Sequence, residues 1–379
     1  MMKKVGIITI YDNNNYGNRL QNYALQEYVN SLGFEVQTIR NIPYKELNNG
    51  TFVSALKKIK RLILNAPGIG KKTRNKEIEQ WKENLYGPYK NSARIKAFSE
   101  FNNYISFFSD VIGYYNMKRL NTQFDFFITG SDQVWNPVLG RGTGLDFLTF
   151  ANEEKRIAYA ASISLDKIPE EFNYRFLRYL NSMKRISLRE QQGVDLIKRE
   201  FNVDSTCVID PTMLIDKHRW QVLADSANVQ LPKKYVLCMF LGDKENEQTI
   251  REYAQKHGCE IVWLNDPNDK DTYSFGPIEF LYAVSHANMF FTDSFHGCVF
   301  SILFHINFYA IERKGQADYM FSRIAGLLSK FDLRRRVLSC ENLNSIELID
   351  EETWARVDEI LRQERIKSKC FFREALELE

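Results

Sequence analysis

The sequence of 379 residues lacks the patterns that assign a function at once. Its six cysteines are widely spaced and include no C-x-x-C pair, which argues against a disulfide framework or a zinc site and fits reduced, buried thiols. The first predicted strand is followed by neither a G-x-G-x-x-G fingerprint nor a P-loop lysine. Because no His, Asp or Glu cluster has the spacing of metal ligands, we expect no metal and no bound cofactor.

Long apolar runs and a bias in charge are also missing. No segment reaches the roughly 20 apolar residues of a membrane-spanning helix, and the apolar run before Asp12 is too short for a signal peptide. The 51 basic and 48 acidic residues leave a net charge of +3, which gives no support for nucleic-acid binding. We therefore expect a soluble, cytoplasmic protein.

What is present is a regular alternation of short apolar strands and amphipathic helices. This alternation predicts an α/β fold with doubly wound parallel sheets, and the chain is too long for one ordinary core. We predict three parts: a Rossmann-like domain at 1–185 with a basic helical insertion at about 51–110, a second Rossmann-like domain at 186–345, and a C-terminal helix at 346–379 that packs back across both domains.

The most informative stretch is a polar elbow between apolar segments. It has a predicted strand at Met289–Thr292, the elbow Asp-Ser-Phe-His-Gly at 293–297, a helix at Cys298–Phe304 and a strand at Asn307–Ile311. The loop after a parallel strand lies at the ligand-binding edge of the sheet, and the following helix points free N–H groups there. His296 is either a structural core histidine or the rim of an anion site, and the crowded polar groups favour the site.

A second polar elbow follows the apolar strand predicted at Phe124–Thr129. Asp132 and Gln133 in this elbow can point to the same kind of edge. Trp135 either offers a face on which a sugar ring stacks or lies in the core.

Two further strand ends carry candidate ligand-binding groups. Arg189 follows the short strand beginning at Ile186, where its planar fork suits a carboxylate or phosphate, or else forms a salt bridge with Glu190. The asparagine-rich loop 13–18 follows the first strand and is either a turn or a hydrogen-bonding loop for a polar ligand such as a sugar.

The segment 51–74 differs in kind from the rest of the chain. It combines lysines and arginines with apolar residues at helical spacing. It is either a solvated insertion helix or a basic amphipathic helix that lies on an anionic membrane surface.

Five segments, in consistent order between about residues 5 and 312, together resemble the polysaccharide pyruvyl transferase family: YGNRLQNYALQ, GSDQVWN, SLRE, VIDPT and TDSFHG. The resemblance implies two facing Rossmann-like domains, GT-B-like, with the site in the cleft between them. It also implies transfer of an enolpyruvyl unit from phosphoenolpyruvate to two hydroxyls of one sugar, which gives a pyruvate ketal on a surface-polysaccharide precursor of a bacterium. The expected acceptor is a lipid-linked oligosaccharide, reached at the inner membrane face through 51–74.

The resemblance also implies roles for individual residues. His296 is the candidate acid that protonates the donor methylene, Arg189 grips the donor, and Asp132 takes the proton of the attacking hydroxyl or orients the sugar. The first domain supplies the acceptor contacts, for which the candidates are Asn15, Tyr16, Asn18, Gln133 and Trp135. The second domain supplies the remaining donor contacts, for which the candidates are Ser294, Phe295, Gly297, Arg313 and Lys314.

One position departs from the family pattern. Family members carry an arginine two residues before the elbow histidine, whereas this chain has Ser294. The donor grip must then come from Arg189, from the helix N-terminus at Gly297, and from Arg313 or Lys314. Two other functions stay open: a GT-B-type glycosyltransferase that uses a nucleotide-sugar, and a non-catalytic carbohydrate-binding relative.

Overall fold

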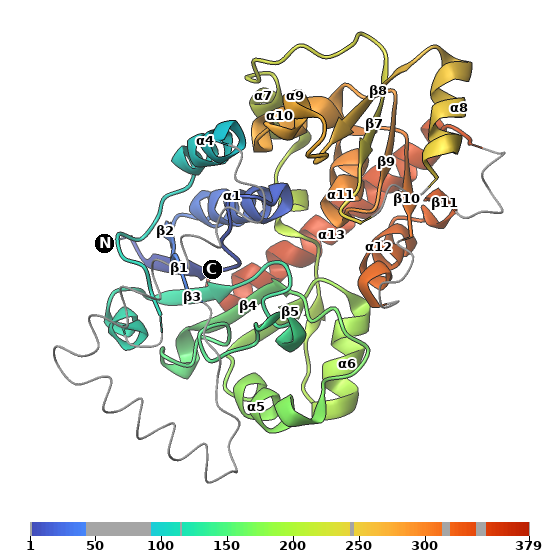
Figure 1. Ribbon diagram of the computed structural model, residues 1–379. Helices are drawn as coiled ribbons and strands as arrows, with labels where there is room; N and C mark the ends of the chain where they lie inside the picture. The colour runs from blue at the N-terminus through green and yellow to red at the C-terminus, as the bar shows by residue number, and fades with distance from the viewer. Residues whose placement is uncertain are drawn as a thin grey trace.

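The computed structural model describes residues 2–42, 92–113, 116–242, 246–312, 319–338 and 346–378. Within these residues the chain forms two sheets, one of six strands and one of five, in which all the strand pairs are parallel. Figure 1 shows the sheets in two domains, with helices packed around each. The predicted α/β class with two Rossmann-like, GT-B-like domains is confirmed.

The first sheet has the strand order β2-β1-β3-β4-β5-β6. Its central strands β3 and β4 are buried at every position, as expected of parallel strands covered by helices on both faces. The strands are β1 (Lys4–Ile8), β2 (Glu35–Thr38), β3 (Phe126–Thr129), β4 (Arg156–Ala161), β5 (Arg185–Leu188) and β6 (Thr206–Cys207). The helices described in this half are α1 (Tyr16–Ser31), α4 (Ser92–Phe101), α5 (Glu170–Leu180) and α6 (Gln191–Phe201). The next helix, α7 (Lys217–Ala224), packs against α10 (Pro277–Ser285) of the second half (Figure 1).

The second sheet has the order β11-β10-β9-β7-β8. Its strands are β7 (Tyr235–Met239), β8 (Glu260–Leu264), β9 (Met289–Thr292), β10 (Phe308–Ile311) and β11 (Val337–Leu338). Its helices are α8 (Glu247–His257), α9 (Lys270–Tyr273), α10 (Pro277–Ser285), α11 (Phe295–Phe304) and α12 (Tyr319–Lys330). Short 3-10 helices connect elements of both halves: η1 (Asn102–Tyr104), η2 (Met117–Thr122), η3 (Pro137–Leu139), η4 (Glu153–Lys155), η5 (Pro211–Leu214) and η6 (Arg334–Arg336).

The two sheets share one topology. Numbered from its own first strand, the second sheet reads 2-1-3-4-5, as the first sheet does before β6. The strand order therefore reverses between β1 and β3, and again between β7 and β9. Ligands of doubly wound sheets bind at the carboxyl ends of the strands beside such a reversal. The loops that follow β3 and β9 are thus expected to form a site.

The domains are joined by a continuous apolar core. One cluster of buried residues contains Val5 and Leu20 of the first domain together with Phe290 of the second. At the junction, the ring of Tyr16 stacks on Phe98 and Phe280, with ring centroids 5.4 and 4.8 Å away. Such stacked aromatic contacts stabilise the interface beyond the area they bury.

The last helix, α13 (Glu351–Ala375), contacts both domains. Its first turn places Trp354 against His305 of the second domain, and its last turns place Phe372 on Tyr159 of β4, with centroids 4.7 and 4.3 Å apart. Figure 1 shows α13 running from one domain to the other. No helix in the described part of the chain has the length and apolar character needed to cross a membrane.

The structure corrects the predicted start of the second domain. We predicted that it begins at residue 186, but β5 and β6 complete the first sheet, where Leu188 pairs with both Ala161 and Cys207. A strand followed by a helix has the same pattern in either sheet, so the sequence does not tell which sheet it joins. Arg189 therefore belongs to the first domain. The basic segment 51–74 lies outside the described residues.

Candidate active site

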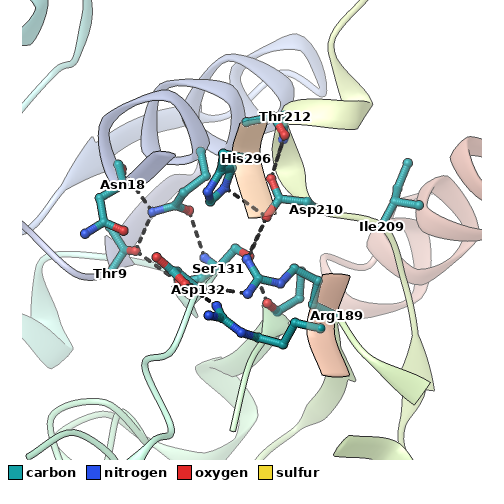
Figure 2. A network of polar contacts seen from close by, with 12 residues as sticks. Thr9, Asn18, Ser131, Asp132, Arg189, Ile209, Asp210, Thr212 and His296 are labelled. Carbon is teal, nitrogen blue, oxygen red and sulfur yellow. Dashed lines mark hydrogen bonds and ion pairs between the residues drawn. The ribbon is translucent and has the colours of Figure 1, made fainter. Parts of the chain in front are cut away.

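Side chains from four strand ends meet between the domains. Asp132, Arg189 and Asp210 follow β3, β5 and β6 of the first domain, and His296 follows β9 of the second. Figure 2 shows these side chains pointing toward one another. The structure thus brings together His296, Asp132 and Arg189, which the sequence reasoning singled out. It adds Asp210, to which that reasoning gave no role.

Asp210 lies at the centre of this group. One of its oxygens accepts hydrogen bonds from the backbone and hydroxyl of Thr212, at 3.0 and 2.7 Å. The other accepts from Ser131 Oγ at 3.2 Å and Arg189 Nη1 at 3.1 Å, and lies 3.5 Å from His296 Nε2. Burial alone would raise the pKa of Asp210, but His296, Arg189 and Thr212 hold that pKa well below its ordinary value. Asp210 is therefore a fixed negative charge.

Arg189 is a buried guanidinium surrounded by carboxylates. Nε donates to Glu190 at 2.9 Å, and the planar group lies over the Phe295 ring, 4.0 Å from its centroid. Although burial opposes the charge, Glu190, Asp132 and Asp210 raise the pKa of Arg189 above its usual value. Nη2 lies 3.5 Å from Asp132 Oδ1 and is buried without a hydrogen-bond partner among the residues that the structure describes. An additional anionic oxygen would satisfy it.

His296 lies in the first turn of α11, because this helix begins at Phe295 and not at the predicted Cys298. Its Nε2 faces Asp210 at 3.5 Å and, within the described part of the chain, is likewise buried without a hydrogen-bond partner. Such orphaned polar atoms reduce stability unless a ligand or water binds them. An imidazole beside a fixed carboxylate is suited to holding and delivering a proton.

The elbow after β3 is held by α1. Gln21, fully buried in α1, accepts a hydrogen bond from the Ser131 backbone at 3.0 Å and donates to Thr9 Oγ1 at 2.8 Å. These bonds fix the backbone that precedes Asp132. Sequence reasoning missed Gln21, although a polar residue on the buried face of a predicted helix is a usable signal.

A pocket of about 320 Å³ opens beside these residues. It lies between the first domain and α12, and its lining includes Arg189, Asp210, Phe295, Arg323, Leu327 and Lys330. Arg323 Nη1 is 3.8 Å from Asp132 Oδ1, so guanidinium groups of both domains reach one carboxylate oxygen. No sequence pattern pointed to Arg323, because its partner is far away in the chain.

Comparison with known proteins identifies the family of this chain. The family model for polysaccharide pyruvyl transferase matches residues 15–315. This range includes α1 and the four strand ends that carry Asp132, Arg189, Asp210 and His296. The chain belongs to the polysaccharide pyruvyl transferase family. No curated protein matches the sequence.

Solved structures resemble this pyruvyl transferase family member in fold. S. aureus MnaA with UDP is 10% identical with a TM-score of 0.48, and the match covers 100% of this chain and 98% of that one. The UDP-GlcNAc 2-epimerase of Methanocaldococcus jannaschii is 12% identical with a TM-score of 0.43, covering 94% and 92%. At these values neither likeness says anything about the reaction.

In this pyruvyl transferase family member the elbow residues mainly hold the loop. Ser294, in place of the family arginine, caps α11 by accepting from the Gly297 backbone at 3.3 Å. Asp293 accepts from the backbones of Leu241 and Gly242 at 2.8 and 2.9 Å. Phe295 packs on Arg189. Arg313 and Lys314, the other predicted donor contacts, lie outside the described residues.

Two expected acceptor contacts are core residues. The structure corrects the expectation for Trp135, which is fully buried and stacks on Phe147 at 4.5 Å between centroids, so its face is not available to a sugar. Tyr16 is buried between two phenylalanines, and its hydroxyl accepts from Arg94 at 2.7 Å. Aromatic residues after a strand suit a core as well as a ligand platform, and packing decided between them here.

The remaining predicted acceptor contacts bond within their own loops. Asn15 caps α1 by accepting from the Asn18 backbone at 3.2 Å, and the Asn18 amide donates to Asp12. Gln133 accepts from Asn136 at 2.9 Å. None of the three lines the pocket described above. Among the described residues, no group of His, Cys, Asp or Glu is placed to hold a metal ion.

Proposed function

We propose that this chain transfers an enolpyruvyl unit from phosphoenolpyruvate to two hydroxyls of one sugar, forming a pyruvate ketal on a surface-polysaccharide precursor. The buried guanidinium of Arg189 carries the proposal, since its Nη2 lacks a hydrogen-bond partner in the described structure and lies beside a pocket. His296 Nε2, which faces Asp210, is also buried and also lacks a hydrogen-bond partner among the described residues. A donor with a carboxylate and a phosphate needs a buried anion-binding fork with an acid next to it.

Arg323 supports the donor assignment. Family resemblance places an arginine at position 294, where this chain has a serine. Arg323 comes from α12 instead and, with Arg189, reaches Asp132 Oδ1 at 3.8 and 3.5 Å. Two guanidinium groups from opposite walls of the pocket can bind the two anionic ends of the donor.

The proposed reaction gives each polar group one task. His296 donates a proton to the donor methylene carbon, which makes C2 electron-poor. A sugar hydroxyl forms a bond to C2 as Asp132 accepts its proton. The bond from C2 to the phosphate oxygen then breaks, and the second hydroxyl closes the ketal while its proton leaves with phosphate. One phosphoenolpyruvate and one sugar diol thus give one ketal and one phosphate, after which the proton on Asp132 returns to His296 through water.

Isothermal titration of phosphoenolpyruvate tests this proposal. We expect Arg189→Ala to weaken binding about 10- to 100-fold, the cost of removing hydrogen bonds to a charged group. Arg185→Ala is the matched control. Arg185 is the first residue of β5, the strand that precedes Arg189; its side chain is about half exposed and pairs with Glu374 at 3.7 Å outside the site. If the wild type binds UDP and not phosphoenolpyruvate, the proposal is wrong and a nucleotide-sugar is the donor.

For the acceptor we propose a lipid-linked oligosaccharide, reached through peripheral contact of the basic segment 51–74 with an anionic membrane. Each basic residue near such a surface contributes about 1 kcal/mol, and salt screens the attraction. Sedimentation with vesicles of phosphatidylglycerol and phosphatidylcholine tests this contact. Pelleting that is lost in salt, and lost when the basic residues of 51–74 are changed to glutamine, supports it. Equal pelleting with neutral vesicles contradicts it.

A further inference from the structure

The two aspartates of the site are held in different ways. Asp210 accepts hydrogen bonds at both oxygens, and its side chain is fully buried. The Asp132 side chain is 12% exposed and is held only by ion pairs, at 3.5 Å from Arg189 and 3.8 Å from Arg323, as far as the described residues go. The Asp132 carboxylate is therefore free to move where that of Asp210 is not.

The backbone of Asp132, in contrast to its side chain, is held in place. Its backbone carbonyl accepts from the Ser162 and Val134 backbones at 2.9 and 2.7 Å. Its φ of +66° places it in the left-handed region, which aspartate and asparagine adopt more readily than most residues. A change of side-chain rotamer can thus move the carboxylate without moving the strand end.

The position of this carboxylate matters because of what lies around it. A single oxygen, Oδ1, is shared by one guanidinium from each domain. At 3.5 Å this oxygen is too far from Arg189 Nη2 to form a hydrogen bond, and that nitrogen has no other hydrogen-bond partner in the described structure. A ligand carboxylate or phosphate would bind both guanidinium groups at shorter distances. It would also compete directly with Asp132 for them.

We infer that Asp132 is a built-in competitor of the donor: phosphoenolpyruvate displaces its carboxylate from Arg189 and Arg323, and the released carboxylate then serves as the base for the sugar hydroxyl. This inference rests on the proposed function. It predicts ordered binding, donor before sugar, because the base is paired with the arginines until the donor replaces it. Before the donor binds, the Asp132 carboxylate also balances the positive charge of these two arginines in a largely buried site.

The test is isothermal titration of phosphoenolpyruvate into the wild type, Asp132→Asn and Glu190→Gln. Asparagine keeps the size and backbone preference of Asp132 but removes the negative charge that competes for the guanidinium groups. We expect Asp132→Asn to bind phosphoenolpyruvate about three- to tenfold more tightly than the wild type. Glu190→Gln removes one negative charge from the same arginine without emptying the donor position, since Glu190 bonds Nε. It should bind no more tightly than the wild type.

Each outcome separates the inference from the proposed function. Tighter binding in Asp132→Asn alone supports the competitor role. Equal or weaker binding in a folded Asp132→Asn, with a wild type that binds, overturns the inference and leaves the donor assignment in place. Equal tightening in both variants also overturns it, because general charge then explains the effect. A wild type that does not bind phosphoenolpyruvate overturns the proposed function and the inference with it.

Discussion

Gly17, in the first turn of α1, lies directly against the ring of His296. A Cβ atom added at Gly17 would come within 2.0 Å of His296 Nδ1. The first helix of one domain thereby fixes the imidazole of the other, with Nε2 facing Asp210. The glycine of the YGNRLQ segment therefore positions the candidate acid.

Gly17→Ala should displace the imidazole and reduce turnover. Misplacement of a reacting group by about 1 Å costs on the order of 100-fold in rate. We also expect a lower melting temperature, although alanine normally stabilises a helix by about 0.5–1 kcal/mol relative to glycine. Phosphate release from phosphoenolpyruvate with a lipid-linked sugar fraction, together with thermal unfolding, measures both effects.

Gly193→Ala in α6 is the matched control for this change. A Cβ at Gly193 would meet Leu188 at an ordinary 3.5 Å. Its turnover should be unchanged and its melting temperature equal or higher. If Gly17→Ala behaves like Gly193→Ala, the contact with His296 has no functional weight.

His296→Asn separates an enzyme from a non-catalytic binding protein. If His296 is the acid, phosphate release should fall about 100- to 10,000-fold, the usual contribution of general acid catalysis. Affinity for phosphoenolpyruvate should change little, because the arginines provide the grip. Titration and phosphate release on the same preparation give the two numbers. Unchanged phosphate release would exclude His296 as the acid.

Local patterns predicted much of the fold. The strand Met289–Thr292 has the predicted bounds, and the strand predicted at Asn307–Ile311 begins one residue later, at Phe308. Runs of apolar and aromatic residues predict such strands because they depend on neighbours within a few residues. The sheet that β5 joins was not predictable in this way. The pairing of Leu188 with Ala161 is a contact between segments far apart in the sequence, and a local strand–helix pattern does not indicate which strands will pair.

The same difference between local patterns and long-range contacts decides which site residues could be predicted. Arg189 and His296 were recognisable because each follows a predicted strand, where parallel sheets present ligands. Arg323 was not, since it lies within a helix and meets Asp132 only through the approach of two domains. Trp135 illustrates the opposite error: its partner Phe147 lies on a later turn, so the sequence offered an aromatic face without showing what covers it.

Asp210 should make stability depend on acid pH. Because neighbouring positive groups and hydrogen bonds hold its folded pKa below the ordinary 3.8, its contribution is complete above about pH 5 and is lost as pH falls through and below 4. We expect Asp210→Asn to be about 3–5 kcal/mol less stable at pH 7, as for other broken buried ion pairs. The gap to the wild type should narrow toward pH 3.

Urea unfolding at pH 7, 5 and 3 measures that gap. Asp204→Asn is the control, because the Asp204 side chain is 90% exposed and pairs with Lys198 at 2.9 Å on the surface. Its stability should follow the wild type within about 1 kcal/mol at each pH. A constant gap for Asp210→Asn across this range would show that Asp210 does not ionise as described.

Arg94 should hold the domains together from outside the pocket. It is buried, donates to Asn14 Oδ1 and Tyr16 Oη, both at 2.7 Å, and reaches Tyr273 O and Asn265 Oδ1 of the second domain, both at 3.1 Å. Arg94→Met removes these charged hydrogen bonds and leaves buried acceptors unpaired, so we expect a loss of about 3 kcal/mol or more in urea unfolding.

Lys96→Met on the same helix is the control for Arg94→Met, because the Lys96 side chain is 78% exposed and pairs with Glu100 at 3.7 Å. It should be neutral within about 0.5 kcal/mol. Phosphoenolpyruvate titration in folded Arg94→Met then decides what the junction does. Unchanged affinity means that the continuous apolar core alone sets the distance between Arg189 and Arg323. A large loss of affinity means that this distance depends on Arg94, since Arg94 does not line the pocket.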